Sequence, residues 1–194
     1  MPGRVVAVSV AHVIDSPVPA RGEGRDVKPR RSGIDKRPVP RPVRVEPLGL
    51  VGDAILDTTH HGGLSQAVYA YALEDQEWWT RELGDELTRP ITPGSFGENL
   101  TVTGVAVNDA RAGERWTIGS VVLEVTDPRT PCSTFAGFMG LRRWVRRFAL
   151  AERPGAYLRV ITPGELRAGD AIDVTPGPPD VPTLREVFAA YYRR

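Results

Sequence analysis

The chain has 194 residues, of which 41% are hydrophobic and 25% charged, and its formal net charge is +1. These values are ordinary for one soluble globular domain that buries its own core. They give no support for a nucleic-acid or membrane surface, and no segment approaches the roughly twenty apolar residues of a spanning helix. Because the chain has a single cysteine and no A-x-A-like cleavage site near its start, the sequence predicts a cytoplasmic protein.

The first part of the chain alternates between short strands and long turns. The valine-rich residues 4–13 predict a largely buried first strand. Residues 15–42 hold many of the 18 prolines and predict a long loop, which in a compact domain is functional or disordered. Residues 43–45 alternate like a short strand. Residues 67–71 predict a strand that enters a helix over residues 74–83, where Gly84 ends it.

The second half carries the clearest local signal, a tight hairpin. Two alternating β-rich runs, residues 115–118 and 121–126, are joined by Gly-Ser. Apolar residues at helical spacing predict one helix over residues 134–150. Strands are expected at residues 157–162 and 171–174, around a turn at 163–164, and an amphipathic helix at 183–192.

This pattern of many short strands, abundant Gly and Pro turns and few helices predicts a mainly β protein. The expected architecture is a closed or partly open β-barrel with a few peripheral helices. No repeated βαβ pattern or Gly-x-Gly-x-x-Gly motif argues for a doubly wound fold. The barrel domain is expected to span residues 1–175, with a linker and the C-terminal helix at 176–194.

Cys132 is the most informative residue, because a lone cysteine cannot form an internal disulfide. It is either a small buried apolar residue or a reactive thiolate. Arg129 places a permanent positive charge nearby, and a cation favours the thiolate. Such a thiolate can bind a transition metal, carry sulfur or attack a carbonyl.

Other loop residues admit both a chemical and a structural interpretation. His60 and His61 can act as a metal ligand or general base, or simply belong to a turn before Gly-Gly. With Cys132, His61 could also serve a nucleophilic hydrolase. Asn99 can bind a ligand or form a β-turn. The arginines of residues 142–147 favour a solvated helix face over a phosphate-binding patch.

Taken in order, these loop segments resemble the MOSC family, the domain shared with the C-terminal part of molybdenum-cofactor sulfurases. The segments are residues 48–53 (LGLVGD), 60–63 (HHGG), 96–100 (FGENL), 128–132 (PRTPC), 158–161 (LRVI) with Gly164, and 168–170 (AGD). They cover about residues 30–175, and the arrangement is most similar to small stand-alone bacterial MOSC proteins. In one departure, Gly155-Ala156-Tyr157 stands where the family often has Gly-Trp, so the resemblance says little about that pocket wall.

The resemblance implies a β-barrel that holds a pterin-based molybdenum cofactor, with Cys132 as the protein ligand of the metal. Arg129 and Lys36 would face the phosphate and pterin oxygens. Asn99 would hydrogen-bond the pterin, and Thr130 could donate its hydroxyl to the same group. His61 would stand near the metal or the substrate. Pyridoxal phosphate is associated with the family through the sulfurases, but this sequence has no desulfurase domain.

Three functions are consistent with this resemblance. The first is a molybdenum-dependent oxidoreductase that reduces N-hydroxylated small molecules, with Cys132 and His61 at the reaction centre. It would need a separate electron-donor protein, because the chain shows no flavin, haem or iron–sulfur motif. The second is sulfur transfer through a persulfide on Cys132. The third is a non-catalytic module that binds or carries the cofactor.

Overall fold

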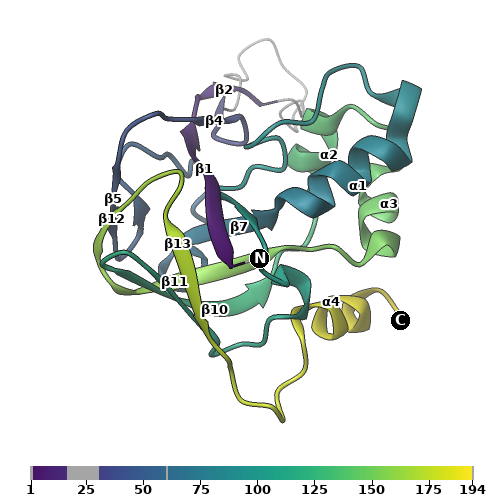
Figure 1. Ribbon diagram of the computed structural model, residues 1–194. Helices are drawn as coiled ribbons and strands as arrows, with labels where there is room; N and C mark the ends of the chain where they lie inside the picture. Colours follow the sequence, from purple (N-terminus) through teal and green to yellow (C-terminus); the bar gives the residue numbers. More distant parts are fainter. Residues whose placement is uncertain (1, 17–30, 60, 194) are drawn as a thin grey trace.

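Seven strands close a β-barrel in the computed structural model, which describes residues 2–16, 31–59 and 61–193. Their order around the barrel is β13-β9-β10-β11-β7-β8-β1, and β13 pairs with β1 to close it. The strands are β1 (Gly3–Ala11), β7 (Val68–Ala72), β8 (Leu100–Thr103), β9 (Arg115–Ile118), β10 (Val121–Pro128), β11 (Ala156–Thr162) and β13 (Ala171–Thr175). All neighbouring pairs are antiparallel except β7 and β8, between which the chain crosses over through a helix. The predicted mainly β barrel is confirmed, and it is closed (Figure 1).

Shorter strands extend this barrel. β4 (Lys36–Pro38) continues the pairing of β1, so the predicted loop over residues 15–42 is wrong for this part, while residues 17–30 lie outside the described residues. β2 (Ile14–Asp15) pairs with β3 (Arg31–Ser32). β5 (Val43–Glu46) pairs with both β6 (Gly49–Leu50) and β12 (Gly164–Leu166). The turn predicted at residues 163–164 therefore leads directly into a strand that the sequence did not predict.

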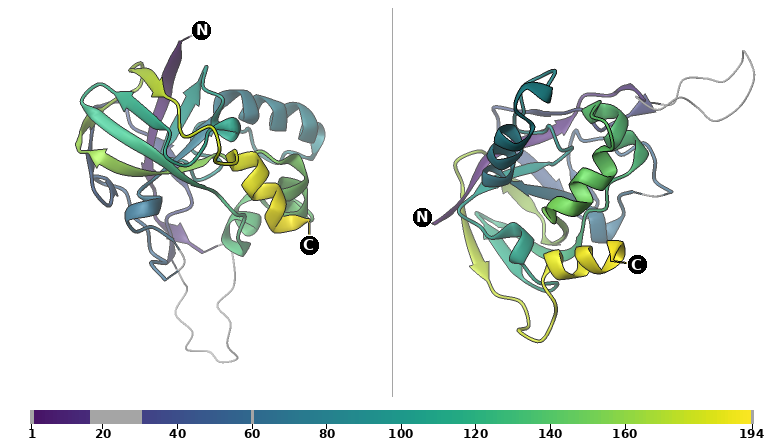
Figure 2. Two further views of the ribbon diagram at one scale, coloured as in Figure 1. Left: turned by 90° about the horizontal axis from the view of Figure 1, so that it is seen from below. Right: turned by 90° about the vertical axis from the view of Figure 1, so that its right-hand side faces the viewer.

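The helices gather on one side of the barrel. They are α1 (Leu73–Leu83), α2 (Ser133–Met139), α3 (Trp144–Ala151) and α4 (Leu184–Tyr192), with short 3₁₀ turns at η1 (Leu64–Gln66), η2 (Gly84–Glu86) and η3 (Val107–Asp109). In the right-hand view of Figure 2, the green α3 lies between the blue α1 and the yellow α4. Among the helices that the structure describes, none has the length and apolarity needed to span a membrane.

The single helix predicted over residues 134–150 is wrong, because two left-handed residues divide it. Gly140 adopts φ 68° and donates its N–H to the Ala136 carbonyl, which ends α2. Arg143 adopts φ 56° directly before α3. The resulting turn lets both helices direct large side chains to the same place, since Phe135, Trp144 and Phe148 are all buried.

Two apolar clusters fill the molecule. An aliphatic cluster with Trp116 occupies the barrel, and an aromatic cluster lies between the barrel and the helices. In the second cluster the Trp79 and Phe148 rings are parallel, with centroids 6.1 Å apart. Trp79 is buried and its neighbour Trp78 is partly exposed, as expected for adjacent residues of α1. Cys132 packs against this aromatic cluster, which therefore supports the loop that carries it.

Candidate functional site

Cys132 lies between the end of β10 and the start of α2, with an extended backbone (φ −108°, ψ 172°). Its side chain is partly exposed. Burial opposes the charged form, but a hydrogen bond from the His61 side chain, the Arg129 charge and the Phe135 backbone N–H outweigh it and lower the pKa of the thiol to about 7. The lowered pKa therefore favours the thiolate form of Cys132 near neutral pH.

His61 reaches this thiol from the opposite loop, between β6 and η1. Its backbone N–H donates to the Asp57 carbonyl at 3.1 Å. Gly62 and Gly63 follow with φ 81° and 79°, a backbone conformation that residues with a side chain disfavour. The structure thus brings together Cys132 and His61, which the sequence could not show to be neighbours. His60 lies outside the described residues.

Arg129 is a buried cation, only 4% exposed. Its guanidinium lies over the Phe135 ring at 3.9 Å and the Tyr69 ring at 5.1 Å, and its Nη1 donates to the Phe96 carbonyl at 2.6 Å. Within the described ranges Arg129 forms no ion pair with a carboxylate.

The anion that faces Arg129 is the Cys132 thiolate. Burial lowers the pKa of Arg129, but Tyr69, Tyr157 and Cys132 more than offset this effect, so the pKa is raised overall. The pKa values of both phenols are themselves raised, chiefly by burial, so the two tyrosines are neutral near pH 7. This leaves the sulfur of Cys132 as the group that carries compensating negative charge.

A second polar cluster holds Lys36 and Asn99. Lys36 Nζ contacts Asp53 Oδ2 at 2.5 Å, and both side chains are 7% exposed. Burial lowers the pKa of Lys36, and Asp53 opposes this effect. Asp53 also accepts the Ala11 N–H and Asn99 Nδ2, each at 2.8 Å. Asn99 Oδ1 in turn accepts the Tyr69 N–H at 3.1 Å, so Tyr69 connects this cluster to Arg129.

Glu98 holds the loop over residues 94–98 in place through hydrogen bonds. Its fully buried carboxylate accepts the Gly94 N–H at 2.6 Å and the Phe96 N–H at 3.0 Å. Thr101 Oγ1 and Gln76 Nε2 donate to it at 2.8 and 2.5 Å. Burial raises the pKa of Glu98, against the effect of these donors. The carboxylate thereby fixes the position of Phe96, whose carbonyl accepts the hydrogen bond from Arg129.

The predicted residues therefore fall into two connected groups. Cys132, His61 and Arg129 meet directly, while Lys36 and Asn99 lie in the cluster around Asp53. Thr130 is exposed beside Arg129. The sequence reasoning assigned no role to Asp53, although a buried lysine requires an acidic partner, nor to Tyr69 and Phe135, which only the packing identifies.

Tyr157 lies in the segment 155–157, where the sequence departs from the Gly-Trp that is frequent in the family. Its ring lies 5.3 Å from that of Tyr69, and its phenol faces Arg129. Gly155 precedes it with φ 70°, where a Cβ would approach the Ala70 carbonyl to 2.6 Å. An aromatic wall is thus retained on β11 with tyrosine in place of tryptophan.

The donor atoms suit one kind of metal contact. In the parts of the chain that the structure describes, no group of three or more His, Cys, Asp or Glu side chains is arranged to enclose an ion. One thiolate supported by an imidazole and a cation instead suits a soft metal that brings most of its ligands with it. The residues therefore fit a molybdenum ion held by its own pterin, with Cys132 adding one sulfur.

The barrel and its thiol-bearing loop define a MOSC-type domain. The family model described as MOSC domain matches residues 57–173, and the chain belongs to this family. It is 31% identical over 149 residues to an uncharacterized protein, YflK, of Bacillus subtilis, covering 77% of this chain and 66% of that protein, or about two thirds of its length.

Two further proteins are similar to this chain. The crystal structure of YiiM from Geobacillus stearothermophilus superposes with a TM-score of 0.75 at 26% identity, covering 99% of this chain and 85% of that one. A protein of Gibberella moniliformis named reductase is 28% identical over 187 residues, covering 88% of this chain but only 32% of that protein.

Proposed function

We propose that this protein is a molybdenum-cofactor-dependent oxidoreductase that reduces N-hydroxylated small molecules, with Cys132 as the protein ligand of the metal. The observation that carries the proposal is the Cys132 thiol, whose pKa is lowered to about 7 between His61 and a buried arginine. Family membership and the relative named reductase support it.

The overall reaction consumes two electrons and two protons. The N–O bond of the hydroxylamine breaks, the nitrogen becomes an amine, and the oxygen leaves as water. When bound, the cofactor would supply the two-electron redox chemistry, and a separate electron-carrier protein would replace the electrons. The chain contributes binding, orientation and control of charge.

Each residue of the site has a proposed task in this reaction. Cys132 Sγ is held ready as a thiolate. Arg129 supplies a fixed positive field that favours the thiolate and an anionic pterin phosphate. His61 hydrogen-bonds Sγ and thereby orients it. Lys36 and Asn99 are proposed to shape the pterin pocket through Asp53, because their polar groups have partners within the protein.

The first experiment measures molybdenum by elemental analysis in protein purified from cells that make the cofactor. Wild type and Ser133→Ala, an exposed neighbouring position, are expected to hold equal metal, and Cys132→Ser is expected to lose most of it. Equal metal in all three proteins, or none in wild type, contradicts the ligand assignment. Reduction of an N-hydroxylated base by the loaded protein, with a chemical reductant, then tests the activity. Bound cofactor without turnover would identify a carrier module instead.

The same thiol supports sulfur transfer as a second candidate, because a partly exposed thiolate of pKa about 7 is a good nucleophile. In that reaction the Cys132 thiolate would attack the outer sulfur of a donor persulfide. A new S–S bond would form on Cys132 and the donor would leave as a thiolate. Intact-mass detection of one added sulfur that is absent in Cys132→Ser, in protein without molybdenum, would favour this candidate.

A further inference from the structure

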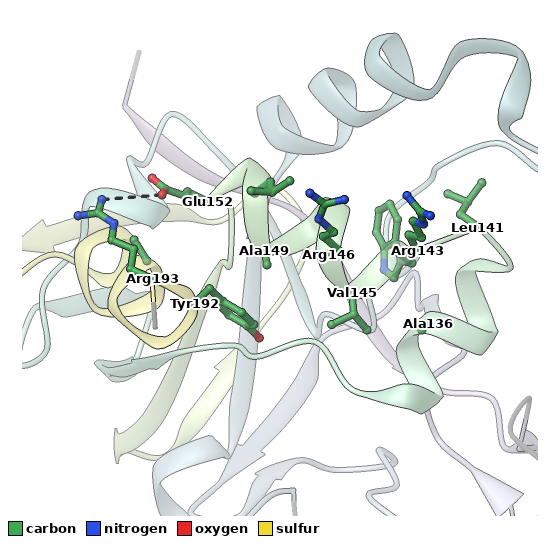
Figure 3. A pocket seen from close by; sticks show the side chains of 12 residues that line it. Ala136, Leu141, Arg143, Val145, Arg146, Ala149, Glu152, Tyr192 and Arg193 are labelled. Atoms are coloured by element: carbon green, nitrogen blue, oxygen red, sulfur yellow. Dashed lines mark ion pairs between the residues drawn. The ribbon is translucent and has the colours of Figure 1, made fainter.

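A groove of about 670 Å³ opens between α3 and α4, on the side of the molecule that carries the helices. Its surface is largely apolar, with Val145, Leu150 and Tyr192 exposed by 37%, 72% and 41%. Figure 3 shows the Arg193–Glu152 ion pair at one end of the groove, Arg146 near its middle and Arg143 toward the other end. The groove is therefore an apolar channel with excess positive charge away from this ion pair.

The charges of Arg143 and Arg146 are not balanced by acidic side chains among the described residues. Arg143 and Arg146 are exposed and form no ion pair with any described residue, whereas the adjacent Arg147 is paired with Glu86. They also stand at the N-terminal end of α3, where the helix dipole disfavours cations. Arg143 further holds a left-handed φ of 56°, which is unfavourable for an arginine. An anionic partner would relieve the electrostatic part of this cost.

The groove also lies close to Cys132. Ala136, which lines it, donates its N–H to the Cys132 carbonyl at 3.0 Å, so one turn of α2 separates them. Trp144 also lines the groove, and its indole N–H is buried without a partner among the described residues. The Trp144 ring lies 5.5 Å from Phe135, which in turn packs under Arg129.

We propose that this groove docks the acidic face of the electron-carrier protein that supplies the two electrons of the proposed reduction. This inference rests on the proposed function. Carboxylates of the carrier would pair with Arg143 and Arg146, and an apolar side chain would occupy the channel between α3 and α4. A one-electron carrier of the ferredoxin class, which is oxidised in the process, would deliver its electrons in two successive encounters one helical turn from Cys132. A second copy of this chain fits less well, because it would bring arginines toward arginines.

The test uses a reduced plant-type [2Fe–2S] ferredoxin as the acidic probe. Binding to the purified full chain is measured by calorimetry at about 20 mM salt, where exposed charges are weakly screened. Arg143→Glu/Arg146→Glu is expected to bind at least tenfold more weakly than wild type. The control Arg41→Glu/Arg81→Glu reverses two exposed arginines outside the groove and is expected to bind like wild type. Leu150→Asp tests the apolar part and should also weaken binding.

Turnover separates docking from the proposed function. With dithionite as a small reductant, Arg143→Glu/Arg146→Glu should reduce the N-hydroxylated base at the wild-type rate, and with ferredoxin it should lose at least tenfold. If no donor supports turnover, the proposed function fails, while the binding comparison still decides whether the groove docks the carrier. Equal or absent ferredoxin binding in wild type and variant overturns the docking proposal. Arginine-dependent binding to anionic lipid vesicles alone, or dissociation of a dimer by the variant, also overturns it.

Discussion

Replacing His61 with alanine tests how this site produces a thiolate. The pKa of Cys132 lies near 7 instead of its ordinary 9.0. At pH 7 this difference corresponds to about half thiolate instead of about 1%, a factor of roughly fifty, or about 3 kcal/mol. This factor is a net effect, because burial raises the pKa and the stabilising groups together more than offset it. His61 is the strongest of these groups, so His61→Ala should lower the thiolate fraction at pH 7 several-fold.

The assay is the rate of iodoacetamide alkylation of Cys132, followed by intact mass from pH 5 to 10 and scaled to the plateau at high pH. In His61→Ala the midpoint should move to higher pH, and the rate at pH 6.5 should fall several-fold while the plateau stays unchanged. His12→Ala, an exposed histidine away from this loop, should match wild type. If wild type itself titrates near pH 9, or if His61→Ala follows the wild-type curve, the electrostatic account of the site is refuted.

Four further predictions concern stability, each measured by urea unfolding. Because the pKa of Cys132 is lowered in the folded protein, the thiolate stabilises the fold above the unfolded-state pKa, and this contribution is lost as the pH falls through about 7. The free energy of unfolding of wild type relative to Cys132→Ser should therefore rise by about 1–2 kcal/mol from pH 7 to 9. Lys36→Met leaves Asp53 buried without its cation and should cost about 3–5 kcal/mol, whereas adding Asp53→Leu should recover part of this cost; additive losses would contradict the pairing. Glu98→Ala leaves four donors unpaired and should cost about 3 kcal/mol or more. Gly140→Ala meets no atom within 4 Å, so it should cost only the left-handed backbone term of about 1 kcal/mol, and a much larger loss would indicate packing instead.

Local patterns were sufficient to predict most of the barrel. The hairpin of β9 and β10 was visible because two alternating runs flank a two-residue turn, and the observed pairing of Val121 with Ile118 matches it. The break between α2 and α3 was missed because both helices bury aromatic residues on one side, so Phe135 and Phe148 kept an apparently continuous period. Gly140 was the available signal, but glycine within a helical pattern is also tolerated.

The site was predictable only where its residues are close in sequence. Arg129 and Cys132 share one loop, so the effect of the charge on the thiol could be anticipated. Asp53 and Lys36 are separated by 17 residues and Asn99 and Asp53 by 46, and they meet because β4 pairs with β1 and the barrel closes. No periodicity encodes such contacts, which depend on strand order and register.

The two buried cations of the site are compensated differently, and this difference separates their functions. Lys36 is neutralised within the protein by Asp53, so it contributes little net field to its surroundings. Arg129 contacts a carbonyl and aromatic rings, none of which cancels its charge. A purely structural arginine at 4% exposure would be expected to have a carboxylate partner. The field of Arg129 therefore acts at the loop: it stabilises the Cys132 thiolate, and it would also favour an anionic group held beside that sulfur.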